Sequence, residues 1–141
     1  MSYSAQSTKS RKIIYWIATL WLALGMVSTG IVQLLQMEEE TASMRDLGYP
    51  LYFLTIIGIW KLLGVVAILI PGFPLLKEWA YAGFFFAMSG AIASHLFSGD
   101  PPTTIFPPLL LLALTIISRA FRPPQRRIIS PNFKDSKSLS L

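Results

Sequence analysis

Residues 50–70 read PLYFLTIIGIWKLLGVVAILI, an apolar run that carries a single charge, Lys61, near its middle. A helix of about 20 apolar residues crosses the roughly 30 Å hydrocarbon core of a bilayer, so this run predicts a membrane-spanning helix. A lysine at the centre of such a helix costs about 2.5–3.5 kcal/mol and usually faces a protein interior or a water-filled cavity. Lys61 is therefore the first candidate for a functional residue.

Three other runs in the chain are also long and apolar enough to span a bilayer. The composition agrees, because 53% of the 141 residues are hydrophobic and 13% are charged, which is too apolar for a soluble domain of this length. We predict spans at about residues 13–35, 50–70, 79–97 and 104–121. The predicted fold class is all-α, an integral membrane four-helix bundle over residues 13–122, with a basic tail at 1–12 and a flexible tail at 123–141.

The basic residues are distributed unequally between the two predicted sides of the membrane. Because cytoplasmic loops retain positive charge, both termini are expected in the cytoplasm. The outer side keeps only Arg45. Anionic lipid accounts for the basic tails, and nucleic acid is not an expected partner, since no basic patch is interleaved with aromatic residues. The residues expected on the cytoplasmic side are Lys9, Arg11, Lys12, Lys77, Arg119, Arg122, Arg126, Arg127, Lys134 and Lys137.

The residues needed for several chemistries are missing from the sequence. The chain has no cysteine and one histidine, which excludes disulfides and thiolate metal sites and does not specify a metal. No nucleophile–base pair, phosphate-binding loop or HExxH motif is present. We therefore predict no catalytic residues, no metal site and no intrinsic cofactor, and we do not expect the chain to be an enzyme on its own.

Polar residues are expected to meet near the outer side of the membrane. Thr29, Gln33, Gln36 and Glu40 lie at i, i+4, i+7 and i+11, which places them along one face of a helix. We predict a ligand-binding pocket formed by Lys61, Gln33 and His95, with Gln36, Glu40 and Tyr49 around it. Two alternatives stay open: Lys61 as an internal hydrogen-bond donor to helix carbonyls or Gln33, and His95 as a structural partner of Asp100 or Glu40.

Small residues indicate where the helices pack closely. Gly58 and Gly64 lie three residues on either side of Lys61, so Lys61 is expected to point away from lipid. The third span carries small residues at steps of three and four, which predicts that its backbone approaches another helix. The predicted packing positions are Gly58, Gly64, Gly83, Ala87, Gly90 and Ala91.

Four segments of the sequence resemble the bacterial DoxX-like family. They are residues 47–53 (LGYPLYF), 58–64 (GIWKLLG), 76–84 (LKEWAYAGF) and 94–101, which contains SHL and GDP. The resemblance extends over about residues 12–124 and implies a small four-helix protein of the bacterial cytoplasmic membrane. Family members often carry an acidic residue where this chain reads Phe86-Ala87-Met88, and its absence here favours a Lys61 that bonds carbonyls or binds a ligand.

The resemblance and the polar residues together predict a binding function. The family name derives from a small subunit associated with thiosulfate:quinone oxidoreduction, so quinone is the cofactor that the resemblance implies. We expect an accessory or small-ligand-binding subunit that takes a quinone or a lipid. The alternative is a quinone-linked oxidoreductase subunit in which Lys61 and His95 move protons, and a small transporter or channel is the third. Partners beyond membrane lipid, either further copies of the chain or a redox complex, stay open.

Overall fold

The computed structural model describes residues 2–123 and 126. Its elements are all helices, which confirms the all-α class: α1 (Ser2–Leu34), α2 (Glu38–Leu47), α3 (Tyr52–Leu69), α4 (Pro74–Ser98) and α5 (Pro102–Ala120). Four of them, α1, α3, α4 and α5, are long and apolar enough to cross a membrane. The predicted tail at 123–141 lies outside the described residues apart from Pro123 and Arg126.

The helix α2 lies in the charged segment between the predicted spans at about residues 13–35 and 50–70, for which no helix was predicted. Its first turn holds Glu38, Glu39 and Glu40, and Arg45 lies in its last turn, so both ends complement the helix dipole. Gly48 ends the helix with φ +80°, and its N–H donates to the Arg45 carbonyl. This is a glycine C-cap, and glycine is the residue that adopts this conformation without steric cost.

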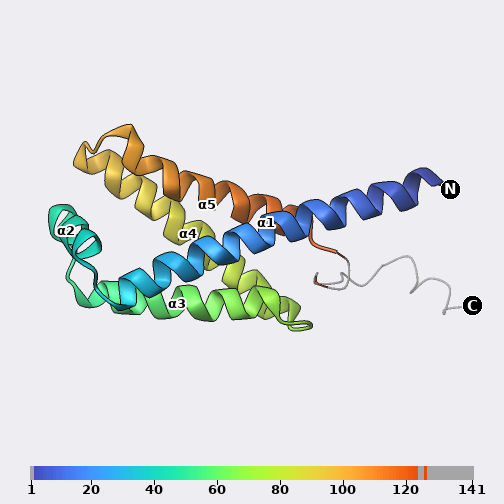
Figure 1. Ribbon diagram of the computed structural model, residues 1–141, viewed down its shortest axis with the longest axis horizontal. Helices are drawn as coiled ribbons and strands as arrows, with labels where there is room; N and C mark the ends of the chain where they lie inside the picture. Colours follow the sequence, from blue (N-terminus) through green and yellow to red (C-terminus); the bar gives the residue numbers. More distant parts are fainter. Residues whose placement is uncertain (1, 124–125, 127–141) are drawn as a thin grey trace, which may run out of the picture.

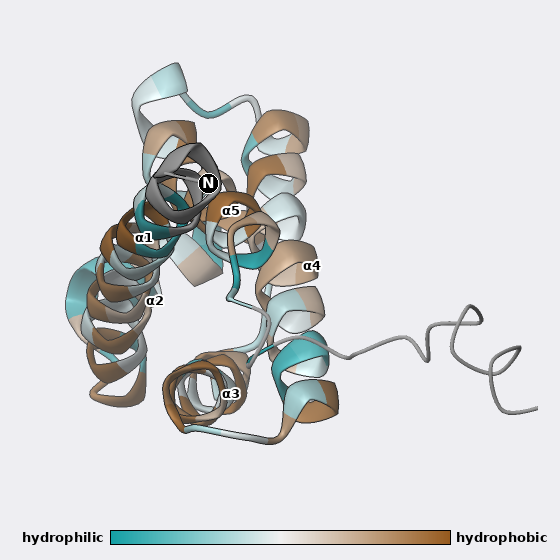
Figure 2. Cartoon of the chain, turned by 90° about the vertical axis from the view of Figure 1, so that its right-hand side faces the viewer, coloured by the Kyte–Doolittle hydropathy of each residue, from teal (hydrophilic) through white to brown (hydrophobic). Residues whose placement is uncertain are grey.

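The four long helices run back and forth along the molecule, each beside two others (Figure 1). Helix α1 packs against α3 and α5, and α4 packs against the same two helices. Figure 2, which looks along the long axis, shows α5 between α1 and α4, with α3 on the opposite side. We name the two ends by their residues: the acidic end holds α2 and the turn at residues 99–101, and the basic end holds the turn at residues 70–73 and the end of α5.

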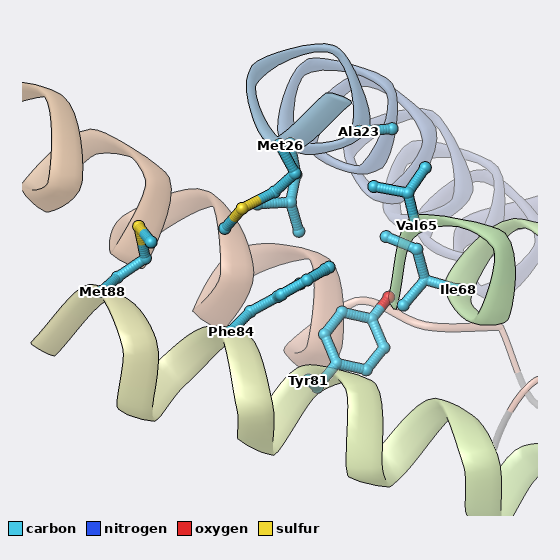
Figure 3. Close-up of a cluster of buried hydrophobic side chains, with 8 residues drawn as sticks. Ala23, Met26, Val65, Ile68, Tyr81, Phe84 and Met88 are labelled. Carbon is cyan, nitrogen blue, oxygen red and sulfur yellow. The ribbon is translucent and has the colours of Figure 1, made fainter. Parts of the chain in front are cut away.

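The core lies between α1, α3 and α4, and its side chains are mostly large and apolar. Figure 3 shows Met26 of α1, Val65 and Ile68 of α3, and Phe84 and Met88 of α4 directed toward one another. A Cβ added at Gly64 would lie 2.6 Å from the ring of Phe84. The absence of a side chain at residue 64 therefore lets the Phe84 ring pack onto the backbone of α3.

The surface of the long helices is also apolar. Large side chains such as Leu24, Trp60, Phe86 and Phe97 are 66–92% exposed, and hydrophobic residues extend along the helices in Figure 2. A soluble monomer rarely exposes so much contiguous apolar surface. A helical protein with an apolar core and an apolar exterior fits a lipid environment.

The prediction that small residues of α4 pack against another helix of the bundle is wrong at Gly83 and Gly90. A Cβ added at Gly83 or Gly90 would meet nothing within 4 Å, and both residues are exposed. The buried face of α4 is instead built from Lys77, Tyr81, Phe84 and Met88. Burying large side chains removes more surface from lipid and gains more dispersion contacts than burying glycines. Ala87 packs at the border of the core, and Ala91 is half-buried.

Candidate functional site

Lys61 lies inside the protein and not toward lipid. Lys61 is 6% exposed, and its Nζ donates a hydrogen bond to Oγ1 of Thr29 at 3.1 Å. The Thr29 hydroxyl donates in turn to the Gly25 carbonyl at 2.9 Å, so its oxygen is available to accept from Lys61. An ammonium group has three N–H donors. Thr29 is the only hydrogen-bond partner of Lys61 among residues 2–123 and 126.

A close approach of α1 and α3 positions this lysine. A Cβ added at Gly30 would lie 3.3 Å from the carbonyl oxygen of Gly58 and 3.4 Å from the Cβ of Lys61. A Cβ added at Gly58 would lie 2.9 Å from the carbonyl oxygen of Gly30. The two glycines bring the helix backbones together, and Lys61 thereby reaches the polar face of α1.

Gln33 and Glu40 continue the polar face toward the acidic end. Gln33 is 8% exposed, and its Nε2 donates to Oε2 of Glu40 at 3.4 Å. Its carbonyl oxygen Oε1 is buried and has no hydrogen-bond partner in the described structure. Glu40 stands in the first turn of α2. One end of α2 thus covers the site with a negative charge.

The remaining predicted site residues make other contacts. Gln36 donates to the Thr55 hydroxyl at 3.3 Å and so links α1 to α3. The Tyr49 hydroxyl shares a hydrogen bond of 2.8 Å with Ser94. His95 Nδ1 lies 2.7 Å from Oδ2 of Asp100 across the end of α4. The structure therefore joins Lys61 with Thr29, and Gln33 with Glu40, whereas the side chains of Tyr49 and His95 bond residues at the end of α4.

A second polar group, at the basic end, was missed by the sequence analysis. Lys77 is fully buried and donates to the carbonyls of Ala67, at 2.9 Å, and Ile70. Arg126 donates to the carbonyls of Ile68 and Leu69, at 3.0 and 3.2 Å. The last carbonyls of a helix have no partner within the helix, and cations near them are favoured by the helix dipole. Lys77 and Arg126 together cap the end of α3.

Glu78 holds two arginines beside this cap. Its Oε2 accepts from Nε of Arg119 at 3.1 Å, and its Oε1 accepts from Arg122. Arg122 is 5% exposed, and its guanidinium also lies over the ring of Tyr81, 5.3 Å from the centroid. This carboxylate therefore ties the start of α4 to the end of α5.

A layer of hydroxyl groups lies just inside the basic end. Ser118 of α5 shares hydrogen bonds with Thr19 of α1, at 2.6 Å, and with Tyr81 of α4, at 2.7 Å. Tyr15, also of α1, is fully buried, and its hydroxyl has no partner of ordinary hydrogen-bond geometry among the described residues. The spacings Tyr15–Thr19 and Lys77–Tyr81, both i and i+4, were a usable signal, because each puts two polar groups on one helix face.

Comparison with known proteins places the chain in a family. The model of the DoxX-like family matches residues 17–118. The chain belongs to the DoxX-like family. Searches of the curated proteins and of the solved structures find no match. Family membership and the four long apolar helices together identify a multi-pass membrane protein.

The residues matched by the model of the DoxX-like family include the whole Lys61 site and part of the polar group at the basic end. Thr29, Gln33, Glu40 and Lys61 all lie within residues 17–118, so the whole Lys61 site belongs to the family region. The group at the basic end extends beyond it, because the match ends before Arg119. No set of three or more His, Cys, Asp or Glu side chains suited to a metal ion occurs within the described part of the chain.

Proposed function

We propose that this DoxX-like protein lies in a bacterial cytoplasmic membrane as a four-helix bundle with both termini in the cytoplasm, and that it binds the headgroup of a quinone at Lys61. The placement is supported by the excess of basic residues at the end that holds both the turn at 70–73 and the end of α5. The acidic end would then face away from the cytoplasm. In that orientation the site extends from Lys61, near the middle of α3, toward the outer surface at Gln33 and Glu40.

The observation that carries the binding proposal is the pair of unused polar groups in the site. Lys61 has N–H donors beyond the one that Thr29 accepts, and the buried Oε1 of Gln33 has no partner among residues 2–123 and 126. Leaving a buried polar group unpaired costs about 1–3 kcal/mol. A ligand that accepts from Lys61 and donates to Gln33 would remove both costs.

A quinone headgroup has the chemistry that this pair requires. In the reduced form, the quinol, one hydroxyl can accept a hydrogen bond from Lys61 and donate to the Gln33 oxygen, whereas the oxidised form can only accept from Lys61. The bound quinone would supply two-electron redox chemistry, and the residues of this chain would bind and orient it. We propose a binding role and not a reaction, because the hydrogen bond of His95 is to Asp100 beyond the end of α4 and not to the Lys61 site.

Native mass spectrometry of the protein extracted gently from its own membrane tests this proposal. The expected result is a bound quinone mass in the wild type that is lost in Lys61→Met and in Gln33→Leu. Lys12→Met is the matched control, because Lys12 is exposed, and it should keep the ligand. A quinone retained by Lys61→Met, or bare spectra for the wild type after addition of quinone, would refute the proposal.

A further inference from the structure

A groove opens between α4 and α5, away from the Lys61 site, in the half of the molecule where the two helices separate toward the basic end (Figure 1). It has a volume of about 380 Å³, within the range of about 300–1,000 Å³ that is usual for ligand pockets. Phe85, Phe86 and Ile116 form its apolar walls, and Glu78 and Arg119 stand at its polar edge. We infer that this groove binds an anionic phospholipid, with the phosphate at Arg119 and an acyl chain along the phenylalanines.

The charge at the edge of the groove matches an anionic headgroup. Arg119 stands at this edge beside Glu78, and the buried Arg122 binds the other oxygen of the same carboxylate, so two guanidinium groups face one carboxylate and leave an excess of one positive charge. Arg119 has a side chain that is 57% exposed, and it uses Nε to reach Glu78. Its two Nη groups have no hydrogen-bond partner in residues 2–123 and 126. Such a pair of donors matches the geometry of a phosphate.

The polar and apolar parts of the groove are also separated by a suitable depth. Glu78 and Phe85 are seven residues apart on α4, which corresponds to about 10 Å along the helix axis. Arg119 lies in the last turn of α5, near the membrane surface, and Phe85 lies deeper in the hydrocarbon. A phospholipid has the same order of parts, with the phosphate at the surface and the acyl chain below it.

The site is tested by titrating the purified full chain in detergent with phosphatidylglycerol and phosphatidylcholine of identical acyl chains, counting bound lipid by native mass spectrometry. The wild type should prefer phosphatidylglycerol. Arg119→Gln should lower its affinity for that lipid roughly fivefold, the size expected for one basic residue near a membrane surface. Arg45→Gln is the matched control, because Arg45 is similarly exposed, at 61%, and lies at the acidic end.

A second pair of variants tests the shape of the groove without changing its charge. Ala82→Trp fills the groove, since Ala82 lines it, and should also weaken phosphatidylglycerol binding. Gly83→Trp adds the same side chain at the next residue, which faces open space, and should leave binding unchanged. Unfolding temperatures of all four variants show whether a lost lipid reflects a lost fold.

Three outcomes would overturn the inference. Equal binding of the two lipids would show that the charge at the edge does not select the headgroup. A loss in Arg119→Gln with full binding in Ala82→Trp would show surface attraction without a groove. Displacement of the lipid by inorganic phosphate at constant ionic strength would show an ion site in place of a lipid site.

Discussion

Gly30 of α1 and Gly58 of α3 face each other across a close helix contact: a Cβ added at Gly30 would lie 3.3 Å from the Gly58 carbonyl oxygen, and one added at Gly58 would lie 2.9 Å from the Gly30 carbonyl oxygen. No other residue type leaves this space for the neighbouring backbone. The contact lies beside Lys61, whose Cβ is 3.4 Å from the position of a Cβ at Gly30. The packing of the two helices and the placement of the lysine therefore depend on the same two residues.

Gly58→Ala should destabilise the protein by about 1–3 kcal/mol, because the added methyl group forces the two backbones apart. Gly83→Ala is the matched control: its methyl group meets nothing within 4 Å, and alanine is favoured over glycine in a helix by about 0.8–1.0 kcal/mol. Unfolding free energies measured in detergent should fall for the first variant and stay level or rise for the second. Equal effects would mean that the glycine contact is not a close one.

Thr29→Val should destabilise the protein, because it removes the acceptor of the buried ammonium of Lys61. Hydrogen bonds between membrane helices are worth about 0.6 kcal/mol on average and up to about 1.7, so a loss in this range is expected. Lys61→Met should leave stability unchanged or raise it, since a buried charge is removed together with its desolvation cost. When Thr29→Val is added to Lys61→Met, it should reduce the free energy of unfolding only slightly. A loss as large as in the wild type would contradict the pairing of Thr29 with Lys61.

The sequence predicted the spans and the burial of Lys61 because both depend on local composition. A long run of apolar residues directly indicates a membrane span. The glycines three residues away on either side of Lys61 indicate that this face of the helix packs against another helix. On α4 the same reasoning failed at Gly83 and Gly90. Their spacing fits an interface, but the opposite side of the helix, with Tyr81, buries larger side chains.

The polar group at the basic end could not be predicted from one segment. Ser118, Tyr81 and Thr19 come from three helices, and their hydroxyls meet only once α1, α4 and α5 are packed. The capping of α3 by Arg126 joins residues that are 57 or 58 apart in the chain. Helical spacing indicates which residues share a face, but it does not indicate which faces meet.

Lys77→Met should destabilise the protein by about 1–3 kcal/mol, because it removes the side-chain donor of the Ala67 carbonyl and leaves the Ile70 carbonyl with Arg126 alone. Lys77 is fully buried and bonds the carbonyls of Ala67 and Ile70. Lys12→Met, at an exposed position of α1, should change stability by less than about 0.5 kcal/mol. Amide hydrogen exchange should also rise in the last turn of α3 in the Lys77 variant alone. Unchanged exchange there would show that Lys77 does not cap the helix.

The ion pair of Glu78 with Arg122 should be worth more than the pair of Glu38 with Arg45. Arg122 is 5% exposed, whereas the side chains of Arg45 and Glu38 are 61% and 87% exposed and 4.0 Å apart. The Glu78 side chain is 22% exposed, so breaking this partly buried pair should cost less than the about 3–5 kcal/mol of a fully buried one and more than the about 0–1 kcal/mol that exposed pairs contribute.

Double-mutant cycles with Glu78→Gln and Arg122→Gln, and with Glu38→Gln and Arg45→Gln, measure the two coupling energies under the same conditions. A coupling energy of about 0.5–3 kcal/mol is usual for residues in one charged network. The coupling energy of Glu78 with Arg122 should lie in the upper part of this range. The second should lie near zero, because water screens both exposed partners. Salt should weaken a coupling between exposed partners and have little effect on the buried one. If the two cycles gave equal couplings, Glu78 would not tie α4 to α5, and the buried position of Arg122 would need another source of stability.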